Sequence, residues 1–226
     1  MHLNSFKTLC LFSLACVGTV AQADINLISG NGNGDNDSKI TALAGSETGP
    51  FHPLTASDFA SALTSDHAFI FNYPAYGWVR SLGDSSGAKW VGVDQNGYYA
   101  NSHSALYAVS FDVVQTITNA QLSLRFSVDD TLGDANNEGV FIDGHALANS
   151  KSGVDWNGVI ENKSFGLGNL AAGTHTLYFD VNNIADGPSS LIFNANIRSQ
   201  AVPEPATYAA LGLGIIGLIR TRKNRS

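Results

Sequence analysis

QLSLRFSV, residues 121–128, decides the fold of this chain. Its apolar residues Leu122, Leu124, Phe126 and Val128 alternate with polar ones. A period of two predicts a β-strand with one buried face and one solvated face, as in antiparallel sheets. Strand-like segments also lie on both sides of it: INLIS (25–29), HAFIFNY (67–73), AKWVGV (88–93), ALYAVSFDVV (105–114), GVFID (139–143), THTLYFDVNN (174–183) and SSLIFNANI (189–197).

Clusters of Gly, Asn and Asp separate these segments at intervals typical of β-sandwiches. Two antiparallel sheets that face each other would bury the apolar rows between them. The sequence therefore predicts an all-β domain over residues 24–201, built as an antiparallel β-sandwich or jelly roll. One helix is predicted inside it, over residues 54–66, because Thr55 and Asp58 have the spacing of a capping box.

The first 23 residues have the pattern of a secretory signal peptide. Lys7 precedes the apolar run TLCLFSLACVGTV, and Ala21 and Ala23 form an A-x-A cleavage site. We therefore predict a cleaved signal peptide over residues 1–23. A lipoprotein signal at Cys16 and a buried helix are the alternatives. The residues before Cys16 miss the lipobox spacing, and the apolar run lacks polar positions at helical spacing.

Both cysteines, Cys10 and Cys16, lie in this leader, so the predicted domain has no disulfide and no thiolate site. Residues 24–201 contain 18 acidic and 7 basic side chains, a net charge of −11. An acidic domain repels nucleic-acid phosphates, so no nucleic-acid partner is expected. This charge suits a solvated extracellular surface.

VDDTLGDANNEG, residues 128–139, concentrates acidic and amide side chains in one loop between two predicted strands. Oxygen ligands at this density are typical of Ca²⁺ sites, and the candidate ligands are Asp129, Asp130, Asp134 and Asn136. The competing interpretation is a solvated turn whose Asp and Asn side chains bond to the local backbone. We favour this turn, because no fixed ligand spacing is met. Structural Ca²⁺ is the one cofactor hypothesis that the residues support.

GDSSG, residues 83–87, matches the G-x-S-x-G nucleophile elbow by its letters. That motif needs a strand before it and a helix after it to expose Ser85, and here a predicted strand follows instead. No histidine has a context that marks it as the general base. His175, on the polar side of its strand, is expected to have no role beyond solvation. We therefore predict that the protein is not an enzyme.

Aromatic side chains offer a different kind of site, because sugar rings stack on them. Trp78, Trp90, Trp156 and the pair Tyr98-Tyr99 are the candidates for such a platform. Aromatic residues also dominate sandwich cores, so burial is the expected fate of most of them.

Three stretches carry a family resemblance that covers residues 67–198: AKWVGVDQNGYYANSHSALYAVSFDVV (88–114), AQLSLRFSVDDTLGDANNEGVFIDG (120–144) and LAAGTHTLYFDVNN (170–183). Their order is similar to that of small exported domains with a galactose-binding-like jelly roll. The resemblance implies this fold, which hosts many functions. The family often has a structural Ca²⁺, but its ligand positions do not map onto this chain residue by residue.

VPEPATYAALGLGIIGLIRTRKNRS, residues 202–226, differs from the rest of the chain. Pro203-Glu204-Pro205 excludes a helix at its start. The 14 apolar residues 206–219 predict a short transmembrane helix of about 21 Å, against roughly 30 Å of hydrocarbon. Basic side chains that snorkel to the interface extend it and mark its cytoplasmic end: Arg220, Arg222, Lys223 and Arg225.

This order of parts resembles the PEP-CTERM sorting signal, also called the ice-binding protein C-terminal domain. The resemblance implies a bacterial envelope protein, held transiently in the inner membrane and processed there by an exosortase. With the signal peptide it implies export through the Sec pathway, a periplasm-facing anchor, and then the cell surface or the extracellular space. Such proteins usually occur with exopolysaccharide and biofilm systems.

The expected function is therefore binding or structural: an exported surface or matrix protein whose β-sandwich contacts exopolysaccharide. One alternative is a secreted glycan hydrolase that uses Asp129 with Glu138 or Asp143 as its two carboxylates. Another is an ice-binding or purely structural surface protein. Only Thr174-His175-Thr176 resembles the Thr-x-Thr ladder that ice binding would favour.

Overall fold

The computed structural model describes residues 24–199, apart from residues 33, 72–76, 94, 96–102, 153–158 and 186. The predicted signal peptide and the predicted sorting segment lie outside the described residues. The elements in chain order are β1 (Asp24–Ile28), β2 (Asn36–Ala44), α1 (Ala56–Thr64), β3 (His67–Phe71), β4 (Trp90–Gly92), β5 (Ala105–Val113), β6 (Ile117–Asp129), β7 (Thr131–Leu132), β8 (Val140–Ile142), β9 (His145–Ala146), β10 (Glu161–Leu170), β11 (Gly173–Asn182) and β12 (Ser190–Ser199).

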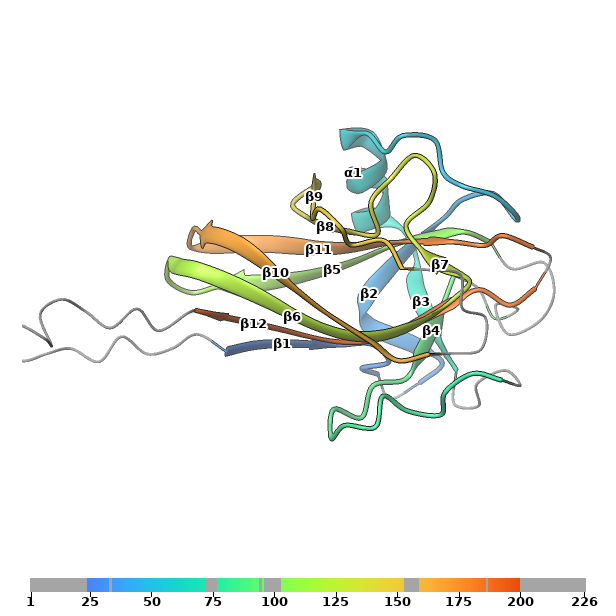
Figure 1. The fold of residues 1–226 in the computed structure, drawn as a ribbon, viewed down its shortest axis with the longest axis horizontal. Helices are drawn as coiled ribbons and strands as arrows, with labels where there is room; N and C mark the ends of the chain where they lie inside the picture. The colour runs from blue at the N-terminus through green and yellow to red at the C-terminus, as the bar shows by residue number, and fades with distance from the viewer. Residues whose placement is uncertain are drawn as a thin grey trace, which may run out of the picture. The chain divides into compact units, whose positions relative to one another are not determined.

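The strands pair in the order β10-β6-β12-β4-β3-β2-β5-β11-β8-β9, with β1 added beside β12 and β7 beside β11. All these pairings are antiparallel. Figure 1 shows the sheet curling so that β6, β12 and β1 lie below β5 and β11, and β10 pairs with β6 at the edge of the lower layer. The two layers of the predicted sandwich are thus parts of one hydrogen-bonded sheet, which turns through the short strands β4 and β3.

Alternation along the strands decides which side chains enter the main core. The row Leu122, Leu124, Phe126 and Val128 on β6 is buried, as the sequence predicts. It meets similar rows from the neighbouring strand β12 and from β11 in the opposite layer, and Phe179 and Phe193 touch there with ring centroids 4.4 Å apart. Strands β2 and β10 were not predicted, because their sequences NDSKITALA and ENKSFGLGNL lack a clear apolar row.

Helix α1 begins inside the predicted range and packs on the outer face of the β5–β11 layer (Figure 1). Its predicted capping box is confirmed, with the Thr55 side chain accepting from the backbone N of Asp58 and the Asp58 side chain accepting from the backbone N of Thr55 at 2.7 Å. Phe59 packs against the rings of Phe141 and Tyr178, with centroids 5.1 and 4.9 Å away. The helix therefore buries the second face of this layer.

A third apolar cluster lies beside the other layer. Trp78 and Trp90 stack with ring centroids 4.3 Å apart and pack with Leu82, Ala88 and Ile192 of β12. The loop before β4 is fixed to the outer face of the sheet in this way, and Nε of Arg125 on β6 donates to the Leu82 carbonyl at 2.7 Å. No helix among the described residues is long and apolar enough to cross a membrane. The domain is a compact unit that contains all the strands named above, α1 and the three apolar clusters.

Candidate functional site

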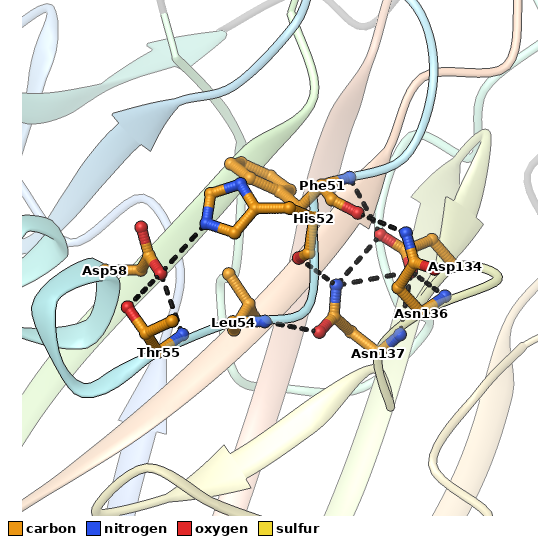
Figure 2. Close-up of polar contacts among 8 residues, drawn as sticks. All are labelled: Phe51, His52, Leu54, Thr55, Asp58, Asp134, Asn136 and Asn137. Carbon is orange, nitrogen blue, oxygen red and sulfur yellow. Dashed lines mark hydrogen bonds and ion pairs between the residues drawn. The ribbon is translucent and has the colours of Figure 1, made fainter.

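The acidic loop 128–139 is organised around Asp134 (Figure 2). Its Oδ1 accepts hydrogen bonds from the backbone N of Asn136 and Asn137 at 2.6 and 2.8 Å. Its Oδ2 accepts one from the backbone N of Phe51, 2.9 Å away and 83 residues earlier in the chain. Asp134 therefore joins this loop to the segment that leads into α1.

Asn136 and Asn137 also connect the acidic loop to the segment that leads into α1. Nδ2 of Asn136 donates to the Phe51 carbonyl at 2.6 Å, and Nδ2 of Asn137 donates to the His52 carbonyl at 3.0 Å. Oδ1 of Asn137 accepts a hydrogen bond from the backbone N of Leu54 at 2.8 Å. The loop thus supplies side chains to backbone groups of residues 51–54, as well as to its own backbone.

The other two predicted calcium ligands make different contacts. Oδ2 of buried Asp129 accepts a hydrogen bond from Nε1 of Trp78, and Oδ2 of Asp130 accepts one from the backbone N of Ile184 at 2.7 Å. Burial and the neighbouring Asp130 raise the pKa of Asp129 to about 8. Among the described residues, no group of three or more His, Cys, Asp or Glu side chains is placed to hold a metal ion. Calcium binding by this loop stays a prediction, whereas the hydrogen bonds agree with the competing turn interpretation.

Asp180 on β11 is a residue that the sequence reasoning missed. Its side chain is fully buried, and neither carboxylate oxygen has a hydrogen-bond partner in the described part of the structure. Burial and the neighbouring carboxylate of Asp134 raise the pKa of Asp180 to about 8. Lys151 lies nearby and donates from Nζ to the Asp134 carbonyl at 2.7 Å. At neutral pH Asp180 is therefore a protonated acid, and it lies next to the Asp134 side chain, which accepts hydrogen bonds from several N–H groups.

His175 is not simply solvated, so that prediction was wrong. Its Nδ1 lies 2.6 Å from Oδ2 of Asp143, and its Nε2 lies 2.9 Å from the Ala171 carbonyl. Partial burial opposes the charged ring, but the Asp143 carboxylate and the carbonyl outweigh it and raise the pKa of His175. The backbone N of Thr176 also donates to Asp143 at 2.8 Å. This ion pair fastens the turn between β8 and β9 to the start of β11.

A polar groove of about 670 Å³ lies on the outer face of the β6–β12–β1 layer. Outward-facing side chains of β1, β6 and β12 form its floor, and the GDSSG loop before β4 forms its wall. Its lining residues are Asp24 and Asn26 of β1, Ser123 of β6, Asn194, Asn196 and Arg198 of β12, and Asp84, Ser85 and Ser86 of the loop.

Hydrogen bonds fix the polar groups on the floor of this groove. Nδ2 of Asn196 donates to Asp24 at 2.5 Å, and Arg198 donates to the two Asp24 oxygens at 3.3 Å each. The hydrogen bonds from Asn196 and Arg198 lower the pKa of Asp24. Its carboxylate therefore stays ionised over a wide pH range.

Asp84 plays the matching role on the wall. It accepts hydrogen bonds from Nδ2 of Asn194 at 3.1 Å and from the backbone N of Ser86 at 3.0 Å. Desolvation opposes ionisation of Asp84, but the hydrogen bonds from Ser86 and Asn194 outweigh it and lower its pKa. Carboxylate and amide groups that hydrogen bonds already hold in position therefore line the groove on two sides.

The catalytic candidates of the sequence do not converge in the structure. Ser85 lies in a loop of bends with no helix between it and β4, and the described residues that line the groove include no histidine. Asp129 lies against Trp78, and Asp143 pairs with His175. Oε2 of Glu138 accepts hydrogen bonds from the backbone N and Oγ of Ser150, at 2.9 and 3.1 Å. Each carboxylate proposed for a glycan hydrolase therefore has a different partner.

The aromatic candidates divide between the core and the undescribed segments. Trp78 and Trp90 are buried in the third cluster, so they offer no open stacking surface. Trp156, Tyr98 and Tyr99 lie outside the described residues. So do the predicted cleavage and sorting residues: Ala21, Ala23, Pro203, Glu204, Pro205, Arg220, Arg222, Lys223 and Arg225.

Comparison with protein families assigns the C-terminal end. Residues 201–223 match the PEP-CTERM protein-sorting motif. The chain carries this motif, which implies an exported protein that an exosortase processes and that is sorted to the cell surface. No curated protein is similar enough to count as a match.

Two solved structures show distant similarity to the chain. One is the GH26-CBM35 β-(1,4)-mannanase of Podospora anserina, with 15% identity and a TM-score of 0.33 over 74% of this chain and 29% of that one. The other is the catalytic unit of the GH87 α-1,3-glucanase of Streptomyces thermodiastaticus, with 12% identity and a TM-score of 0.26 over 76% and 29%. This chain covers less than a third of each of these proteins.

Proposed function

We propose that this exported protein is a non-enzymatic, polysaccharide-binding module of the cell surface or extracellular matrix. The observation that supports this most directly is the polar groove on the outer face of the β6–β12–β1 layer. Sugar hydroxyls both donate and accept hydrogen bonds, so carboxylate, amide and hydroxyl side chains fixed side by side are suitable partners. The groove is open, and a polymer can lie along it without its ends entering.

The proposed route to the surface uses both ends of the chain. The signal peptide 1–23 directs export through the Sec pathway, and residues 206–219 hold the protein in the inner membrane with the domain in the periplasm. The basic tail stays in the cytoplasm, and an exosortase acts at Pro203-Glu204-Pro205. The released domain then meets the exopolysaccharide of a biofilm.

Replacing Glu204 by alanine is expected to leave the protein in the membrane fraction, because the substitution removes the one charged group of the Pro-Glu-Pro motif. Cell fractionation with an antibody against the domain measures the ratio of released to anchored protein. Lys163→Ala, a substitution within the domain, is the control and should not alter this ratio. Equal release of the Glu204→Ala variant and the unaltered protein would contradict the sorting role.

Replacing Asn194 and Asn196 together by alanine is expected to weaken polysaccharide retention at least about tenfold, because a lost hydrogen bond costs about 1 kcal/mol. Retention on a polysaccharide array measures this, with reducing-end release followed in the same wells. Thr174→Ala, at the exposed start of β11 in the other layer, is the matched control. Reducing ends that appear with the unaltered protein and vanish with Asp129→Ala would favour the glycan-active alternative instead.

A further inference from the structure

The groove contains charges of both signs, and their pairing bears on which polysaccharide it accepts. Among the described residues, Arg198 is the one cationic side chain that lines it, and Asp24 and Asp84 are the anionic ones. Arg125 lies just outside, on the neighbouring strand β6. If either arginine were free, the groove could hold a carboxylate or sulfate group of a polymer.

Arg198 already has a carboxylate partner within the groove. Its Nε and one terminal nitrogen each lie 3.3 Å from an oxygen of Asp24, and the two residues face each other across the β1–β12 pair. Arg198 thus directs towards Asp24 the same two nitrogens with which it would bind the carboxylate or sulfate group of an anionic sugar. Asn196 donates to the same carboxylate, so Asp24 is held in position from two sides.

Arg125 is engaged by three acceptors. Its Nε donates to the Leu82 carbonyl at 2.7 Å and lies 3.9 Å from Oδ2 of Asp84. A terminal nitrogen donates to Oδ1 of Asn162 at 3.0 Å. These contacts leave the local charge of the groove balanced by its own carboxylates.

The net charge of the whole domain also disfavours a polyanionic ligand. Residues 24–201 have a net charge of −11, which repels a polyanion before it reaches the groove. A neutral polymer meets no such barrier. Its hydroxyl groups can donate to the ionised carboxylates and accept from the asparagine amides.

We infer that the groove selects neutral, hydroxyl-rich polysaccharides and rejects polyanionic ones that contain uronate or sulfate groups. This inference rests on the proposed function of the same groove. It assigns Asp24 a specificity role, because its carboxylate both accepts from sugar hydroxyls and keeps Arg198 from binding anions.

The test compares four immobilised polymers: dextran and mannan as neutral probes, alginate and hyaluronan as polyanionic probes. The domain is produced as residues 24–199 in two forms: one begins at Asp24, as the predicted cleavage after Ala23 would leave it, and the other has a short extension before Asp24 that removes the α-amino charge from the groove. The variants are Asp24→Asn, Arg198→Gln and Asp112→Asn. Asp112 is exposed on β5 in the other layer, so its variant changes the net charge equally without touching the groove.

The unaltered domain is expected to be retained at least about tenfold better on a neutral polymer than on either polyanion, at about 0.15 M salt. Asp24→Asn is expected to lower the neutral retention and to create retention on alginate or hyaluronan. Asp112→Asn should change neither. Each substitution keeps or reduces side-chain size, and an unchanged melting temperature confirms that the variants are folded.

Different results would overturn the inferred selectivity and the proposed polysaccharide binding. Stronger retention of the unaltered domain on a polyanion, lost in Arg198→Gln, would overturn the inferred selectivity while leaving polysaccharide binding intact. Neutral retention that Asp24→Asn leaves unchanged would also overturn it. No retention on any of the four polymers, together with none on a wider array, would overturn the proposed function itself.

Discussion

Replacing Asp134 by alanine is expected to lower the free energy of unfolding of the domain by about 3–5 kcal/mol, because the substitution leaves several buried N–H groups without an acceptor. Phe51 and Asn137 lose the partner of a buried backbone N–H, and Asn136 loses that of a half-buried one. Urea unfolding at pH 5 measures the change, since Asp180 keeps its proton there and charge repulsion in the pair does not complicate the comparison.

The matched control is Asp58→Ala, which removes an aspartate that caps the exposed start of α1. Loss of a helix cap costs about 1 kcal/mol. If the two variants unfold at the same urea concentration, Asp134 does not organise the junction between residues 51–54 and the acidic loop. The same melts in millimolar Ca²⁺ and in chelator test the predicted metal site, because identical curves would exclude stabilisation by calcium.

Replacing Asp180 by asparagine is expected to raise the stability of the domain at pH 8 by about 2–4 kcal/mol and to change it little at pH 4. The pKa of Asp180 is about 8 in the folded chain, against an ordinary value near 4 in the unfolded chain. Between these values unfolding releases a proton, so the stability supplied by the neutral acid is present at low pH and lost as the pH rises. An asparagine never ionises, and its amide can donate to Asp134.

Thermal unfolding from pH 4 to pH 9 measures this difference, with Asp112→Asn as the control for net charge. Asp129, whose pKa is also raised to about 8, contributes to the slope of both proteins and cancels in the comparison. Parallel stability curves for Asp180→Asn and the unaltered domain would contradict the expected role. A gain from Ca²⁺ at pH 8 that Asp180→Asn abolishes would instead mean that the carboxyl pair holds a cation.

Local patterns in the sequence predicted local structure well. The alternation at Leu122 to Val128 depends only on which residues share a strand face, and the capping box of Thr55 and Asp58 spans three residues. Asp134 was partly predictable for the same reason, since its bonds to the backbone of Asn136 and Asn137 belong to one turn. Its bond to Phe51 crosses 83 residues and has no signal in the local sequence.

The period of two could not reveal what covers the second face of each layer. On β11 the row with Tyr178 and Asp180 looks solvated in the sequence, but both side chains are buried. On β12 the row Asn194, Asn196 and Arg198 looks similar and stays open as the floor of the groove. Phe59 of α1 covers Tyr178, and the acidic loop with Asp134 lies against Asp180, so the difference depends on contacts between distant parts of the chain.

The pairing of the first and last strands determines how the domain carries a mechanical load. Asp24 at the start of β1 lies opposite Arg198 near the end of β12, and β12 also pairs with β6 along all of Ser190 to Ser199. A pull on the chain after Ser199 acts along β12, so the hydrogen bonds on both of its edges are strained together rather than one after another. Because β12 also carries three groove residues, a force applied at the groove acts on this same strand.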